Sequence, residues 1–169
     1  MIVVSDTSPL RYLAALGQLE LLPRLFQEIL CPQTVITECL HPAAPEPLRE
    51  WAREPPAWLR SITTDPLDPR TLDLDPGEAA AITLALDLKA NLLLIDERKG
   101  RAKVAALGLN RIGTLAVLAQ AGRRGHLDYP VTVARLMGET NFRASAAVIQ
   151  TTWEHSLIHH EEGGFRSSP

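Results

Sequence analysis

Two segments of this chain share one order: a short apolar strand, an aspartate, and then the start of a helix. The first is MIVVSDTSPL, in which an apolar, β-branched run is followed by Asp6 and then by Ser8 and Pro9, a residue pair typical of a helix start. The second is NLLLIDERKG, in which the buried run ends in Asp96. Short buried strands that alternate with helices indicate an α/β fold around a mostly parallel sheet.

The rest of the chain continues this alternation. Strands are also predicted at 28–31, 58–62 and 110–113, and helices at 9–16, 19–26, 33–40, 47–54, 77–90, 97–109, 114–125, 131–137 and 143–153. The segment 41–76 holds eight of the 13 prolines, and 63–76 is predicted to be a long loop. A loop of this length is usually functional or mobile. Residues 161–169 have the composition of a disordered tail.

Length and composition exclude several classes of protein. The 169 residues correspond to one domain, or one domain with a short appendage. No apolar run approaches the roughly 20 residues that span a bilayer, and the N-terminus lacks the features of a signal peptide. Only two cysteines, Cys31 and Cys39, are present, which excludes a disulfide framework. We therefore expect a cytoplasmic protein without a membrane partner.

The charge is unevenly distributed. The formal net charge is -3, which argues against nucleic-acid binding by bulk positive charge. The stretch 96–124 nevertheless holds seven basic and two acidic residues. This region could meet phosphates, and the alternative is a set of solvated helix faces.

Asp6 and Asp96 both follow buried strands, where open parallel sheets bind their ligands. Two carboxylates at one sheet edge repel each other, and Mg²⁺ or Mn²⁺ would compensate because these cations prefer oxygen ligands. Each aspartate also has a structural alternative. Asp6 could form a turn onto the Ser8 amide, and Asp96 could cap the helix that begins at Glu97.

Two glutamates are further candidates. Glu78 lies in the sequence DPGE, where Asp75 and Glu78 could form a capping box. Gly77 has poor helix propensity inside this first turn and would let another group approach the backbone. Glu38 interrupts an apolar stretch of a short helix, and as a lone residue it would more often be a solvated charge.

Five motifs occur in an order that resembles a PIN domain: VSDTSPL, VITECL, LDPGEAAAITLA, LLLIDERKGR and RIGTLAVLAQA. The similarity is to a PIN-like subfamily of unknown function, related to VapC-type toxin ribonucleases. It covers residues 1–128, which leaves 129–169 as a helical extension with a disordered tail. The resemblance implies a three-layer α/β/α fold and a metal-dependent endoribonuclease.

The resemblance also implies roles for single residues. Four acids would gather around Mg²⁺ or Mn²⁺ as catalytic residues, with the first, third and fourth as metal ligands: Asp6, Glu38, Glu78 and Asp96. The hydroxyl groups of Ser8 and Thr114 would fix the orientation of these carboxylates. Many PIN toxins carry a further acid where this chain reads ERKGR. Glu97 would substitute for it, or activity would be weak or absent.

The residues that follow Asp96 predict an RNA partner. Arg98, Lys99 and Arg101 lie just beyond Asp96 and could hold the RNA backbone. The resemblance further implies an antitoxin protein and a homodimer. Apolar helices after Gly17 and near Leu136 could supply the dimer patch.

Three other functions remain open. A receiver or phosphatase domain also places an aspartate after a parallel strand, but the chain reads Asp-Thr-Ser rather than Asp-x-Asp. A non-catalytic PIN-like module that binds nucleic acid or protein is an alternative from a different class. The spacing of His155 and His159, with His160 adjacent, could hold zinc, although a polar helix end is the simpler explanation.

Overall fold

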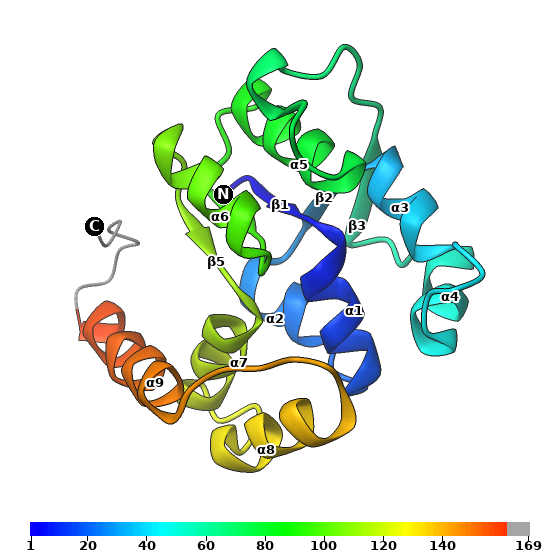
Figure 1. Ribbon diagram of the computed structural model, residues 1–169. Helices are drawn as coiled ribbons and strands as arrows, with labels where there is room; N and C mark the ends of the chain where they lie inside the picture. The colour runs from blue at the N-terminus through cyan, green and yellow to red at the C-terminus, as the bar shows by residue number, and fades with distance from the viewer. Residues whose placement is uncertain (162–169) are drawn as a thin grey trace.

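The computed structural model describes the backbone of residues 1–161 and the side chains of residues 1–156. Five parallel strands form one central sheet in the order β3-β2-β1-β4-β5 (Figure 1). They are β1 (Val3–Ser5), β2 (Ile29–Pro32), β3 (Leu59–Ile62), β4 (Leu92–Leu94) and β5 (Arg111–Ile112). β1 lies in the centre and pairs with both β2 and β4. The predicted strands are therefore confirmed, and all of their pairings are parallel.

Helices cover both faces of the sheet. They are α1 (Thr7–Ala15), α2 (Leu21–Phe26), α3 (Gln33–Cys39), α4 (Glu46–Arg53), α5 (Pro76–Asp87), α6 (Arg98–Ala106), α7 (Thr114–Arg123), α8 (Tyr129–Glu139) and α9 (Ala146–Glu161). Successive strand residues face opposite layers, as the pleat requires. Val3 and Leu94 join a core with α1, α2 and α7, whereas Val4 and Leu93 join a core with α5. The result is the three-layer α/β/α architecture that the resemblance implied.

The segment 63–76 is more ordered than the predicted loop. It contains a short 3₁₀ helix, η1 (Pro69–Thr71), and its last residue, Pro76, already belongs to α5. The η1 turn forms because the Asp68 carboxylate accepts a hydrogen bond of 2.9 Å from the Arg70 amide. This cap was not recognised in the proline-rich sequence.

The start of α9 also differs from the prediction. The helix begins at Ala146 rather than at Arg143. The Arg143 guanidinium instead donates to the carbonyl oxygens of Met137, Thr140 and Phe142, at distances of 3.2, 3.2 and 2.7 Å. Arg143 therefore ties the end of α8 to the following turn.

α8 and α9 pack on α7. The Tyr129 and Trp153 rings stack with their centroids 4.9 Å apart, and the Arg123 guanidinium lies 3.4 Å from the Trp153 ring centroid. The residue nearest the expected dimer patch, Leu136, is fully buried within this chain, as is Leu22 after Gly17. These two leucines therefore belong to the core of the chain, and the homodimer with its apolar patch stays a prediction.

The division into a 1–128 domain and a 129–169 extension stays a prediction. Of the predicted tail at 161–169, Glu161 belongs to α9, and residues 162–169 lie outside the described residues. Along residues 1–161, none of the helices combines the length and the hydrophobicity that crossing a membrane requires.

Candidate functional site

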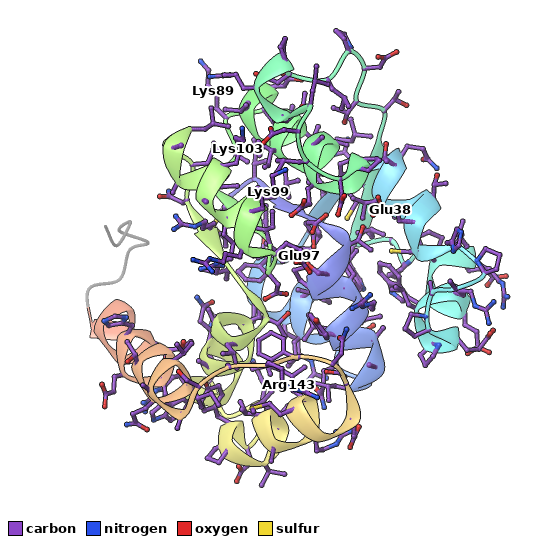
Figure 2. The ribbon with its side chains drawn as sticks, viewed as in Figure 1. Glu38, Lys89, Glu97, Lys99, Lys103 and Arg143 are labelled. Atoms are coloured by element: carbon purple, nitrogen blue, oxygen red, sulfur yellow. The ribbon has the colours of Figure 1, made fainter. Side chains whose placement is uncertain are left out.

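Four acidic residues come from four elements at the carboxyl edge of the sheet. Asp6 follows β1 directly, and Asp96 lies two residues beyond β4. These strands are neighbours, and the Asp6 amide donates to the Leu94 carbonyl at 2.9 Å. Glu38 comes from α3 and Glu78 from the first turn of α5. Figure 2 shows Glu38 and Glu97 on either side of the start of α1.

Asp6 is a buried carboxylate with one unpaired oxygen. Its side chain is 2% exposed; Oδ2 accepts a 3.2 Å hydrogen bond from Ser8 Oγ, and Oδ1 has no partner. Burial raises the pKa of Asp6 to about 7, and the charges of Glu78 and Glu38 act in the same direction. The turn onto the Ser8 amide is not formed, since the side chain of Asp6 makes no capping bond to α1. Ser8 supports the carboxylate through its hydroxyl, as predicted.

Glu78 is the second buried carboxylate with an unpaired oxygen. Its Oε1 is buried without a hydrogen-bond partner. Burial raises the pKa of Glu78, and the charges of Asp75 and Glu97 add to this effect. Asp75 stands at the N-cap of α5, but its side chain makes no capping bond, so the capping box is incomplete. A hydrogen bond from the Asp75 backbone amide lowers the pKa of Glu78 in part, so one half of the box is present, but it leaves Oε1 unpaired.

Glu38 is docked on two helices rather than solvated. The Thr7 hydroxyl at the start of α1 donates to Oε2, and the Gly77 amide of α5 donates to Oε1 at 2.8 Å. A side chain at position 77 would have no room, because a Cβ there would lie 2.6 Å from Oε1. The predicted close approach at Gly77 is confirmed, and the approaching group is the Glu38 carboxylate.

Asp96 is held by the start of α7. The Thr114 amide donates to Oδ1 at 2.8 Å, and the Thr114 hydroxyl donates to Oδ2 at 2.6 Å. The structural alternative, in which Asp96 caps the helix after it, is not formed, since Glu97 takes the N-cap position of α6. Burial raises the pKa of Asp96, whereas the bonds from Thr114 and the charge of Arg101 lower it. Thr114 thus lies where the sequence placed it, as a support for Asp96.

Sequence reasoning missed three residues that shape the site. Thr7 binds Glu38, and glycines at 100 and 113 leave room for the other acids. A Cβ at Gly100 would lie 2.5 Å from Glu78 Oε1, and one at Gly113 would lie 2.6 Å from Asp96 Oδ1. Gly100 offered the same signal as Gly77, a glycine within the first turn of a helix.

The residues after Asp96 differ in their surroundings. Glu97 and Arg98 are exposed at the start of α6. Lys99 donates to the Asp73 carbonyl and lies 3.6 Å from the Asp73 carboxylate, so it is engaged with the loop before α5. Arg101 is half-buried, and its Nη1 donates to the Ile95 carbonyl at 3.0 Å.

The described side chains do not already form a metal cage. Among residues 1–156, no three Asp, Glu, His or Cys side chains converge closely enough to hold an ion. Two oxygens nevertheless fit a cation, because Asp6 Oδ1 and Glu78 Oε1 are buried and lack any partner. The side chains of His159 and His160 lie outside the described residues, so the zinc alternative stays open.

A family model described as a PIN domain matches residues 2–156. This chain belongs to the PIN domain family. PIN domains commonly act as nucleases and typically use divalent metals. The match to this PIN domain extends beyond residue 128 and includes α8 and most of α9. No curated protein and no solved structure matches the chain.

Proposed function

We propose that this PIN domain is a metal-dependent endoribonuclease that hydrolyses RNA phosphodiester bonds. One observation carries the proposal. Asp6 and Glu78 each bury a carboxylate oxygen that no protein group binds, and the charge of Glu78 raises the pKa of Asp6. Buried polar groups are nearly always paired, so two unpaired carboxylate oxygens point to a missing cation.

Mg²⁺ or Mn²⁺ fits this donor set, since both prefer carboxylate oxygens and water. Asp6 and Glu78 would hold the ion, joined by Asp96 from the neighbouring strand. When bound, such a cation polarises a phosphoryl oxygen and makes water a stronger acid.

The other residues orient the groups that react. Ser8 fixes the Asp6 carboxylate, and Thr114 fixes the Asp96 carboxylate through two hydrogen bonds. Thr7 and the Gly77 amide fix Glu38. Its remaining lone pairs are thereby oriented to accept a proton from the attacking water.

RNA cleavage tests the proposal directly. A mixed pool of single-stranded RNA is incubated with Mn²⁺, Mg²⁺ or EDTA and wild type, Asp6→Asn or Asp96→Asn. We expect metal-dependent cleavage by the wild type and a loss of at least about 100-fold in both variants, because each removes a charged ligand. Asp87→Asn, an exposed aspartate at the end of α5, is the matched control. Cleavage by Asp6→Asn at the wild-type rate would reject the assignment.

A binding module without turnover is the second candidate. It is favoured by the lack of three converging ligands among the described side chains. Folded wild type that binds RNA but cleaves nothing with Mn²⁺ would support it over the nuclease.

Partners and location are proposed on the resemblance to VapC-type toxins. The chain would be the cytoplasmic toxin of a toxin–antitoxin pair and a homodimer. Growth arrest on expression that a neighbouring gene relieves would support the toxin role. Light scattering tests the dimer, which a monomer mass of 18.5 kDa would exclude.

A further inference from the structure

Two arginines lie together between α6 and the edge strand β5. Arg111 belongs to β5, where the next residue, Ile112, packs against the core that contains α1 and α7. Because side chains alternate along a strand, Arg111 faces the opposite layer, which α6 covers. α6 and β5 are in contact, and Arg101 comes from α6 (Figure 1).

Arg101 borders the carboxylate site. A methyl group at Gly113 would lie 2.6 Å from Asp96 Oδ1 and 3.3 Å from Arg101 Nη1, so both groups border the same small space. The Arg101 guanidinium donates once, to the Ile95 carbonyl. An arginine has five N–H donors, so most of its donors have no protein acceptor.

The side chain of Arg111 also has an unpaired hydrogen-bond donor. Its Nε is buried without a hydrogen-bond partner. Among the described residues, neither Arg101 nor Arg111 lies within ion-pairing distance of a carboxylate. Burial and the charge of Arg111 lower the pKa of Arg101, whereas the charge of Asp96 raises it. Two half-buried cations with unused donors call for an anion between them.

We infer that Arg101 and Arg111 form a phosphate-binding pair that holds the RNA backbone beside Asp96. Guanidinium groups bind phosphate through paired, parallel hydrogen bonds, which suits two arginines at one site. The inference rests on the proposed ribonuclease function, and it names the part of the site that receives the substrate. It adds Arg111, which is separated from the acidic motifs in the sequence, to the expected RNA-binding residues.

RNA binding without metal tests the pair apart from cleavage. A short fluorescein-labelled single-stranded RNA of mixed sequence is titrated in EDTA with wild type, Arg101→Gln, Arg111→Gln, Arg111→Lys and Arg24→Gln. Arg24 is the matched control, because it is exposed on α2. This helix leads into the amino end of β2, whereas the acidic site lies at the carboxyl ends of the strands. Thermal melting verifies that each variant is folded.

We expect the dissociation constant to rise about five- to tenfold in Arg101→Gln and Arg111→Gln and less than twofold in Arg24→Gln. The slope of log affinity against log salt should become shallower by about 0.7 in the two glutamine variants, as for one lost phosphate contact on a single strand. Arg111→Lys keeps the charge and should restore the slope, with only part of the affinity. The pair is rejected if Arg111→Gln matches the wild type, if Arg24→Gln is equally weakened, or if Arg111→Lys loses as much as Arg111→Gln.

Calorimetric Mn²⁺ binding separates this inference from the nuclease proposal. Arg111→Gln should bind Mn²⁺ like the wild type, whereas Asp6→Asn should not. Arginine-dependent RNA binding by a protein that never cleaves would reject the nuclease and leave the pair standing. Normal cleavage with unchanged RNA binding by Arg111→Gln would reject the pair alone.

Discussion

At the scale of single residues, Asp6 carries the largest electrostatic cost in the site. This residue follows the central strand and is 2% exposed, and one oxygen of its carboxyl group has no partner. The cost appears as a pKa of about 7 instead of 3.8. Without a cation, much of the folded protein therefore holds a proton on Asp6 at neutral pH.

The stability of the metal-free chain should depend on pH through Asp6. Between pH 4 and pH 7 the folded chain keeps this proton and the unfolded chain does not, so stability falls as pH rises through that range. The contribution is at most about 1.4 kcal/mol per pH unit. Melting in EDTA at a series of pH values should show this fall in wild type and Asp87→Asn, but a flatter curve in Asp6→Asn. An Asp6→Asn curve that runs parallel to the wild type would contradict the assigned cause.

Gly100→Ala should weaken metal binding without unfolding the protein. The new methyl group would lie 2.5 Å from both Glu78 Oε1 and Ile95 Cδ1, so the carboxylate must move away. Alanine is favoured over glycine within a helix by roughly 0.5–1 kcal/mol, which offsets the displacement. We expect Mn²⁺ affinity, measured by calorimetry, to fall about tenfold or more. Gly138→Ala in α8 is the control, because nothing lies within 4 Å of its added methyl group, and an equal loss there would contradict the steric explanation.

The four acids could be found from sequence because each has a local signal. Asp6 and Asp96 directly follow apolar runs, and Glu78 stands beside a glycine in a helix start. Thr7 could not be found in this way. Its partner, Glu38, is 31 residues away and belongs to another helix, so only the folded chain brings them together.

At the scale of elements, α9 is anchored through one aromatic side chain. Trp153 stacks on Tyr129, carries the Arg123 guanidinium on its ring, and lies where a Cβ at Gly122 would approach its ring edge to 3.1 Å. Large aromatic side chains contribute strongly to packing, so the position of α9 on α7 depends on this residue.

Trp153→Ala should destabilise the protein without affecting the metal site. We expect the free energy of unfolding to fall by about 2 kcal/mol, below the range for a fully buried tryptophan, since Trp153 is only partly buried. Urea denaturation measures the loss, with the exposed neighbour Glu154→Ala as control. A loss of Mn²⁺ affinity in folded Trp153→Ala would contradict the separation of the two regions.

Element types were easier to predict than element ends. The alternation of apolar runs and helical segments predicted the five strands. The starts of η1 and α9 depend on side chains that accept a backbone amide, Asp68 and Ser145, and such bonds leave little trace in the hydrophobic pattern.

At the scale of the whole molecule, α8 contributes to the same core as α1, α2 and α7. Tyr129, Val133 and Leu136 of α8 belong to the same buried cluster as Leu118 of α7. Removal of α8 and α9 would expose this face of α7 to water.

A chain that ends at residue 128 should therefore fold poorly. Exposed core leucines and alanines of α7 cost about 25 cal/mol for each Å² of apolar surface, against a total stability of about 5–15 kcal/mol. We expect the shortened chain to unfold without a cooperative transition, or to aggregate, in thermal melts followed by circular dichroism. A cooperative melt close to that of the full chain would instead support the predicted boundary at 128.

The glycines at 77, 100 and 113 allow the acidic site to be disrupted by a single added methyl group. Each stands against one carboxylate, so a single methyl group can displace an acid while every formal charge stays in place. Under the proposed ribonuclease function, a chain altered in this way would keep its formal charges for binding RNA but would not hold its acids in place for cleavage. It would serve as a trap: RNA captured on it from a cell would remain whole, and its sequence would identify the natural target.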